Sequence, residues 1–120
     1  MAFSSLFISD SQTMSAEAAV LGVPNIRFSD DVGRLGYLNE LENKYELSVG
    51  ISPDNTYALF SKVERWIGKL DKITEKFRAR RVQMLRDKID VTAFFVWFLD
   101  NFPESKKIML ENPDYQNRFK

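Results

Sequence analysis

The residues best suited to binding a ligand lie near the start of the chain, between Ser9 and Glu17. An apolar run at residues 6–8 precedes Asp10 and Ser11, and an alanine-rich segment follows them. This pattern predicts a buried strand that ends where a helix begins, with Asp10 or Ser11 as the N-cap. A helix N-terminus offers unpaired backbone N–H groups and a partial positive charge, so phosphate groups bind there readily.

Several side chains add to the chemistry of this helix end. Ser11 and Thr13 carry hydroxyl groups that can donate to phosphate oxygens, and Gln12 lies between them. Glu17 follows about a turn and a half later, where a carboxylate can reach a ribose diol. Arg34 lies in the loop after the second predicted strand, which emerges at the same edge of the sheet. The predicted phosphate- and ribose-binding residues are therefore Ser11, Gln12, Thr13, Glu17 and Arg34.

Each of these residues also has a plainer interpretation. Ser11 can be an ordinary N-cap, and Glu17 an ordinary acid that complements the helix dipole. Arg34 can be a solvated surface arginine. Asp30 and Asp31 are adjacent acids without a third ligand nearby in the sequence, so no metal site is predicted from them.

The composition excludes several kinds of catalytic site. The 120 residues include no cysteine and no histidine, which excludes disulfides, thiolate or imidazole metal ligands and a Ser-His-Asp triad. Basic and acidic residues number 17 each, and this balance argues against a nucleic-acid partner. The basic residues from Lys76 to Lys88 are mixed with Glu75 and Asp87 and lie around the helix, which is typical of a solvated helix face. We predict no catalytic residue and no cofactor in this chain.

Hydrophobic periodicity predicts an α/β fold. Residues 6–28 have the pattern of a strand, a helix over 12–21 and a second strand over 25–28. A short helix over 37–44 and a third strand over 47–51 follow, giving a short three-stranded parallel sheet with right-handed crossovers. The C-terminal half is expected to be helical, with helices over residues 53–67, 70–88 and 91–99 and a stop or a last short helix at Pro103. Asp90 is the predicted N-cap of the helix over 91–99.

The chain is long enough for one domain and too short for two. We expect residues 1–120 to form a single partial domain, with the sheet region at 1–52, helices at 53–111 and a frayed tail at 112–120. The first residues lack the charged region of a signal peptide, and no apolar run approaches the roughly 20 residues of a membrane span. These features predict a cytoplasmic protein.

Five spaced blocks carry a family resemblance, and they are Asp10-Ser11-Gln12-Thr13-Met14, Glu17-Ala18-Ala19, Leu21-Gly22-Val23-Pro24, Gly33-Arg34-Leu35-Gly36-Tyr37-Leu38 and Glu40-Leu41-Glu42-Asn43-Lys44-Tyr45. In these blocks the chain resembles a poorly characterised prokaryotic family related to UDP-N-acetylglucosamine 2-epimerase and to GT-B glycosyltransferases. The resemblance covers about residues 6–100. It implies the second half of the C-terminal, Rossmann-like domain of a two-domain GT-B protein.

The resemblance also implies a ligand and residue roles. In the epimerase relatives an Asp-Ser-Gly-Gly turn holds the nucleotide diphosphate, and a glutamate further along the helix holds the ribose hydroxyls. By position Ser11 matches that serine and Glu17 that glutamate, whereas Gln12 and Thr13 stand where the relatives have glycine. The implied ligand is a nucleotide sugar such as a UDP-sugar. Because the acceptor domain and half of the donor domain lie outside this chain, we expect no turnover by the chain alone.

The alternative is a non-catalytic remnant that oligomerises and binds no ligand. The helix around Trp97 also carries Phe94, Phe95 and Phe98, so it is aromatic on nearly every side and needs burial on more than one side. The first strand would lie at an open edge of the sheet, which invites pairing with another chain. Both features predict a homo-oligomer formed through the first strand and this aromatic helix.

Overall fold

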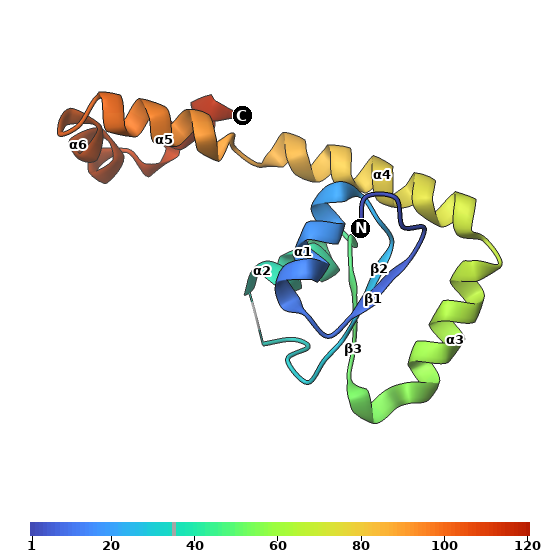
Figure 1. Ribbon diagram of the computed structural model, residues 1–120. Coiled ribbons are helices and arrows are strands. Elements are labelled where there is room, and N and C mark those ends of the chain that lie inside the picture. Colours follow the sequence, from blue (N-terminus) through green and yellow to red (C-terminus); the bar gives the residue numbers. More distant parts are fainter. Residues whose placement is uncertain (35) are drawn as a thin grey trace. The chain divides into compact units, whose positions relative to one another are not determined.

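The computed structural model describes residues 1–34 and 36–120, and it has the α/β fold that the sequence predicts (Figure 1). Leu35, in one of the blocks of family resemblance, lies outside the described residues. The chain divides into two compact units, Met1–Gln83 and Met84–Lys120, which are described separately.

The first unit contains a three-stranded parallel sheet. Its strands are β1 (Phe7–Ser9), β2 (Asn25–Phe28) and β3 (Val49–Ile51), in the order β1-β2-β3. Ile8 of β1 is aligned with Ile26 of β2, which is fully buried. The order puts β1 and β3 at opposite edges, so the predicted sheet and the edge position of β1 are confirmed.

The helix that joins β1 to β2 has the predicted bounds. This helix, α1 (Gln12–Leu21), begins after the N-cap Ser11 and ends at Gly22. Gly22 has a φ of 73°, a left-handed conformation that glycine adopts without steric cost and that favours it as a helix C-cap. Ala18 and Ala19 are fully buried, and their small side chains allow α1 to pack closely on the sheet.

The connection from β2 to β3 differs in detail from the single short helix predicted at 37–44. It consists of α2 (Gly36–Asn39) and a π-helix, η1 (Glu40–Lys44), which bury Leu38 and Leu41. The third strand begins later than predicted because the N–H of Leu47 donates to the carbonyl oxygen of Leu41 at 2.8 Å instead of joining the sheet.

Helices cover both faces of the sheet. A 3-10 turn, η2 (Pro53–Asn55), leads into α3 (Thr56–Ile67), and α4 (Leu70–Asp87) follows. In Figure 1, α1 and α2 lie on one side of the sheet and α3 on the other. Trp66 and Phe77 are buried and meet edge to face, with ring centroids 5.5 Å apart. For this reason α3 and most of α4 belong to the same compact unit as the sheet.

The second unit is helical. It contains the end of α4, then α5 (Val91–Asp100), α6 (Glu104–Glu111) and a final 3-10 segment, η3 (Pro113–Phe119). Asp90 caps α5 as predicted, because its Oδ1 accepts a hydrogen bond from the backbone N–H of Ala93 at 2.9 Å.

The C-terminal tail differs from the expectation that residues 112–120 fray. The ring centroid of Trp97 lies 4.8 Å from that of Tyr115 and 5.4 Å from that of Phe119. The backbone also joins this contact, since Asp90 N–H donates to the carbonyl oxygen of Phe119 at 2.6 Å. Aromatic packing thus holds the tail on one face of α5.

Candidate functional site

The strand-to-helix junction lies where the sequence places it. The N–H of Ser11 donates to Ser9 Oγ at 3.0 Å, and Ser11 Oγ accepts from the N–H of Met14 at 3.3 Å. The carbonyl oxygen of Ser11 accepts from the N–H of Ser15 at 3.1 Å. Because Ser11 Oγ acts here as an acceptor, its hydroxyl hydrogen remains able to donate to a ligand.

The first turn of α1 leaves two backbone donors without an acceptor in the helix. A helix cannot satisfy its first N–H groups internally. Ser11 satisfies those of Met14 and Ser15, so those of Gln12 and Thr13 remain for an outside acceptor. Together with the positive end of the helix dipole, they form a place where an anion would be stabilised.

The side chain of Gln12 joins this helix end to the loop after β2. Gln12 Nε2 donates to Asp31 Oδ2 at 2.7 Å, and the N–H of Asp31 donates to Ser29 Oγ at 3.3 Å. Arg34 follows in the same loop with an exposed side chain, and its N–H donates to the carbonyl oxygen of Asp31 at 3.1 Å. The structure therefore brings the Arg34 loop to the N-terminus of α1. The Gln12 side-chain amide group already donates a hydrogen bond to Asp31 of this loop.

Thr13 and Glu17 share one exposed face of α1. Residues four apart on a helix are surface neighbours, separated by about 6 Å along the axis. A hydroxyl group near the helix end and a carboxylate one turn behind it are thus available to the same ligand. This spacing suits a phosphate group followed by a ribose.

Sequence reasoning missed a buried ion pair between β2 and the π-helix. The side chain of Arg27 is fully buried, and its Nε and Nη2 atoms donate to Glu42 Oε1 at 3.2 and 2.9 Å. Gly50 makes room for the carboxylate, because a Cβ built there would lie 2.9 Å from both Glu42 oxygens. The sequence signal that could have indicated this ion pair is the presence of an arginine in a strand predicted to be buried.

A second buried polar group fixes the spacing of β2 and β3. Asn25 Nδ2 donates to the carbonyl oxygens of Leu47 at 2.8 Å and Val23 at 3.2 Å. Ser48 Oγ donates to Asn25 Oδ1 at 2.6 Å. Asn25 is fully buried, so these bonds replace the water that its amide group loses on folding.

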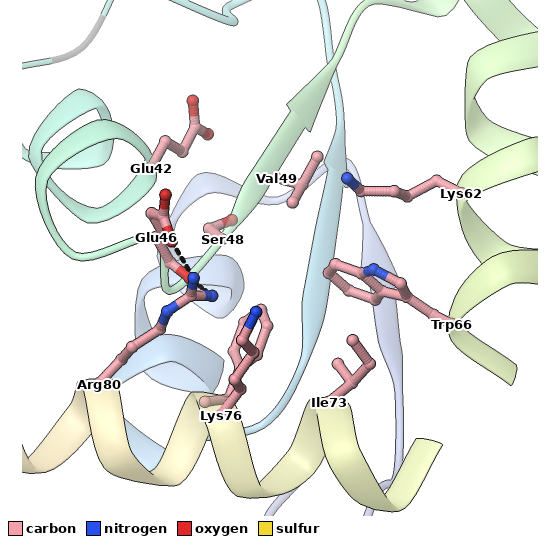
Figure 2. A pocket seen from close by; sticks show the side chains of 10 residues that line it. Glu42, Glu46, Ser48, Val49, Lys62, Trp66, Ile73, Lys76 and Arg80 are labelled. Carbon is pink, nitrogen blue, oxygen red and sulfur yellow. Dashed lines mark hydrogen bonds and ion pairs between the residues drawn. The ribbon is translucent and has the colours of Figure 1, made fainter. Parts of the chain in front are cut away.

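A pocket of about 320 Å³ lies beside β3, in the first unit (Figure 2). It was not predicted, because its walls come from η1, β3, α3 and α4, which are separated in the sequence. The residues around it include Glu42, Glu46, Val49, Lys62, Trp66, Lys76 and Arg80. The pocket adjoins β3 and the α1 junction follows β1, so the two lie at opposite edges of the sheet.

Comparisons of the chain with protein-family models, with curated proteins and with solved structures found no match. Within residues 1–34 and 36–120, no helix is both long and apolar enough to cross a membrane. The same residues contain no cluster of three or more acidic side chains placed to hold a metal ion. A functional proposal therefore depends on the geometry at the two edges of the sheet and on the sequence resemblance.

Proposed function

We propose that this chain binds a nucleotide sugar of the UDP-sugar class, as the donor half of a GT-B glycosyltransferase or epimerase-like protein. The observation that carries the proposal is the junction at Ser11, at the carboxyl end of a parallel strand, where the N–H groups of Gln12 and Thr13 have no acceptor among the described residues. Ligands of open α/β sheets bind at such ends. The sequence resemblance supports the same ligand.

The roles of the residues follow from their positions. The N–H groups of Gln12 and Thr13 and the hydroxyl groups of Ser11 and Thr13 would donate to the diphosphate. Glu17, one turn behind Thr13, would accept hydrogen bonds from the ribose hydroxyl groups. Arg34 would offset part of the charge of the diphosphate. The contribution of this chain is electrostatic positioning, and a catalytic base would have to come from another domain.

Equilibrium titration with UDP tests the proposal. Glu17→Gln is expected to weaken UDP binding about tenfold, because a carboxylate accepts the ribose hydroxyl groups more strongly than an amide does. Inorganic pyrophosphate, which has no ribose, should bind the variant and the parent chain equally. Glu64→Gln on the exposed face of α3 is the matched control and should change neither affinity. Equal UDP affinity for the Glu17→Gln variant and the parent would contradict the ribose role.

A second candidate function, oligomerisation without a ligand, is favoured by the free face of α5. Phe94, Trp97 and Phe98 on one side of α5 pack within the second unit. On the other side, Phe95 and Leu99 are 57% and 69% exposed. We propose that this apolar face pairs with the same face of a second copy, because residues four apart form one continuous stripe.

Mass measurement by sedimentation tests this second candidate. The parent chain is expected to sediment as a dimer or larger species at high micromolar concentration. The double variant Phe95→Glu/Leu99→Glu should sediment as a monomer of 14.0 kDa. The matched control is Glu64→Lys on α3, which changes charge in the first unit and leaves the residues of the stripe unchanged. A 14.0 kDa parent species at that concentration would overturn the oligomer.

A further inference from the structure

Part of the lining of the pocket beside β3 is apolar. Trp66 and Phe77 are buried against each other, and Val49 and Ile73 border the same space. Its volume, about 320 Å³, lies at the lower end of the range of about 300–1,000 Å³ that is usual for small-molecule sites. A small apolar body would therefore fit.

Basic side chains line another part of the pocket. Figure 2 shows Lys62 reaching toward β3 from α3, Lys76 rising from α4, and Arg80 beside Glu46. Lys62 Nζ lies 5.4 Å from the centre of the Trp66 ring. In the part of the chain that the structure describes, the Lys76 amino group has no hydrogen bond or ion pair.

The acidic side chains of the pocket are already neutralised by the protein. Glu42 is paired with the buried Arg27, and Glu46 is paired with Arg80. Arg80 also donates from Nη1 to the carbonyl oxygen of Glu46 at 3.1 Å. These pairs leave the positive charges of Lys62 and Lys76 without a compensating acid in the pocket.

We propose that this pocket binds a small anion with a flat apolar body, of the class of aromatic carboxylates and aromatic phosphate monoesters. The apolar ring would contact Val49, Ile73 and the edge of Trp66, and the anionic group would lie between the amino groups of Lys62 and Lys76. The inference is independent of the nucleotide-sugar proposal, because the two sites lie at opposite edges of the sheet.

Titration of the full, isotope-labelled chain with benzoate and with phenyl phosphate tests the pocket. We expect saturable shifts of the Trp66 indole N–H and of the amides of β3, and intermolecular NOEs from the ring protons to the methyl groups of Val49 and Ile73. Neutral benzamide and inorganic phosphate should each bind about tenfold more weakly or worse, because each lacks one of the two required features.

The double variant Lys62→Gln/Lys76→Gln supplies the charge control. It should lower benzoate affinity about tenfold or more, whereas Lys69→Gln/Lys72→Gln, which removes the same charge outside the pocket, should leave it unchanged. No shift at millimolar benzoate would overturn the proposal. So would equal affinity for benzamide, or an equal loss in both double variants.

Discussion

Glu42→Gln is expected to lower the free energy of unfolding of the first unit by about 3 kcal/mol, which is a large share of the usual 5–15 kcal/mol. Glu42 is the carboxylate that accepts both hydrogen bonds of the fully buried Arg27 side chain. An arginine stays charged at any accessible pH, so the variant leaves a buried charge without a counter-charge. Among residues 1–34 and 36–120, Arg27 Nη1 is already buried without a partner, and none of them offers the guanidinium group a second acceptor to replace Glu42.

Chemical unfolding, followed by tryptophan fluorescence in a Trp97→Phe background, measures this loss, because Trp66 then reports on the first unit alone. The matched control is Glu40→Gln in the same π-helix. The Glu40–Lys44 pair is solvent-exposed, with the lysine side chain 57% exposed, so Glu40→Gln should lower the free energy of unfolding far less than Glu42→Gln does. The double variant Arg27→Met/Glu42→Leu should recover most of the lost stability. A loss below about 1 kcal/mol in Glu42→Gln would contradict the role given to the ion pair.

Asn25→Ala is expected to destabilise the same unit by about 2–4 kcal/mol. The change removes the two donors that satisfy the carbonyl oxygens of Val23 and Leu47, and it removes the acceptor of the Ser48 hydroxyl group. These buried polar atoms would then lack partners, and each unsatisfied group costs roughly 1–3 kcal/mol. The same fluorescence-detected unfolding experiment measures the effect.

Ser48→Ala separates the contributions within this network. It removes one hydrogen bond, so it should cost about 1 kcal/mol, and the double variant Asn25→Ala/Ser48→Ala should cost less than the sum of the two single changes. Asn43→Ala on the exposed surface of η1 should stay within about 0.5 kcal/mol of the parent. Strict additivity of Asn25→Ala and Ser48→Ala would show that the two side chains do not depend on each other.

Local signals in the sequence were sufficient to predict the strand and helix bounds nearest the proposed nucleotide site. Hydrophobic periodicity predicted the bounds of α1 and β2. In the structure, Ser11 and Gly22 have the backbone conformations that helix caps require. The predicted N-cap Asp90 is also confirmed. Each of these features depends on a few adjacent residues, so it can be read before the fold is known.

The remaining features depend on contacts between distant residues. Glu42 could not be assigned to Arg27 without the register of β2 and β3, and the π-helix that carries Glu42 has no distinctive local pattern. The pocket near Trp66 combines side chains from four elements, so no single spacing predicts it. The tail was expected to fray because the ends of a chain are usually poorly ordered, whereas Phe119 packs on Trp97.

The most direct test of the nucleotide-sugar proposal is a map of amide chemical shifts in the labelled chain as UDP and UDP-N-acetylglucosamine are added. We predict saturable shifts concentrated at Gln12, Thr13 and Glu17, with little change along β3 at the other edge of the sheet. If amides from Ser11 to Glu17 stay in place at millimolar ligand, the first turn of α1 is only a capped helix end and the proposal is wrong.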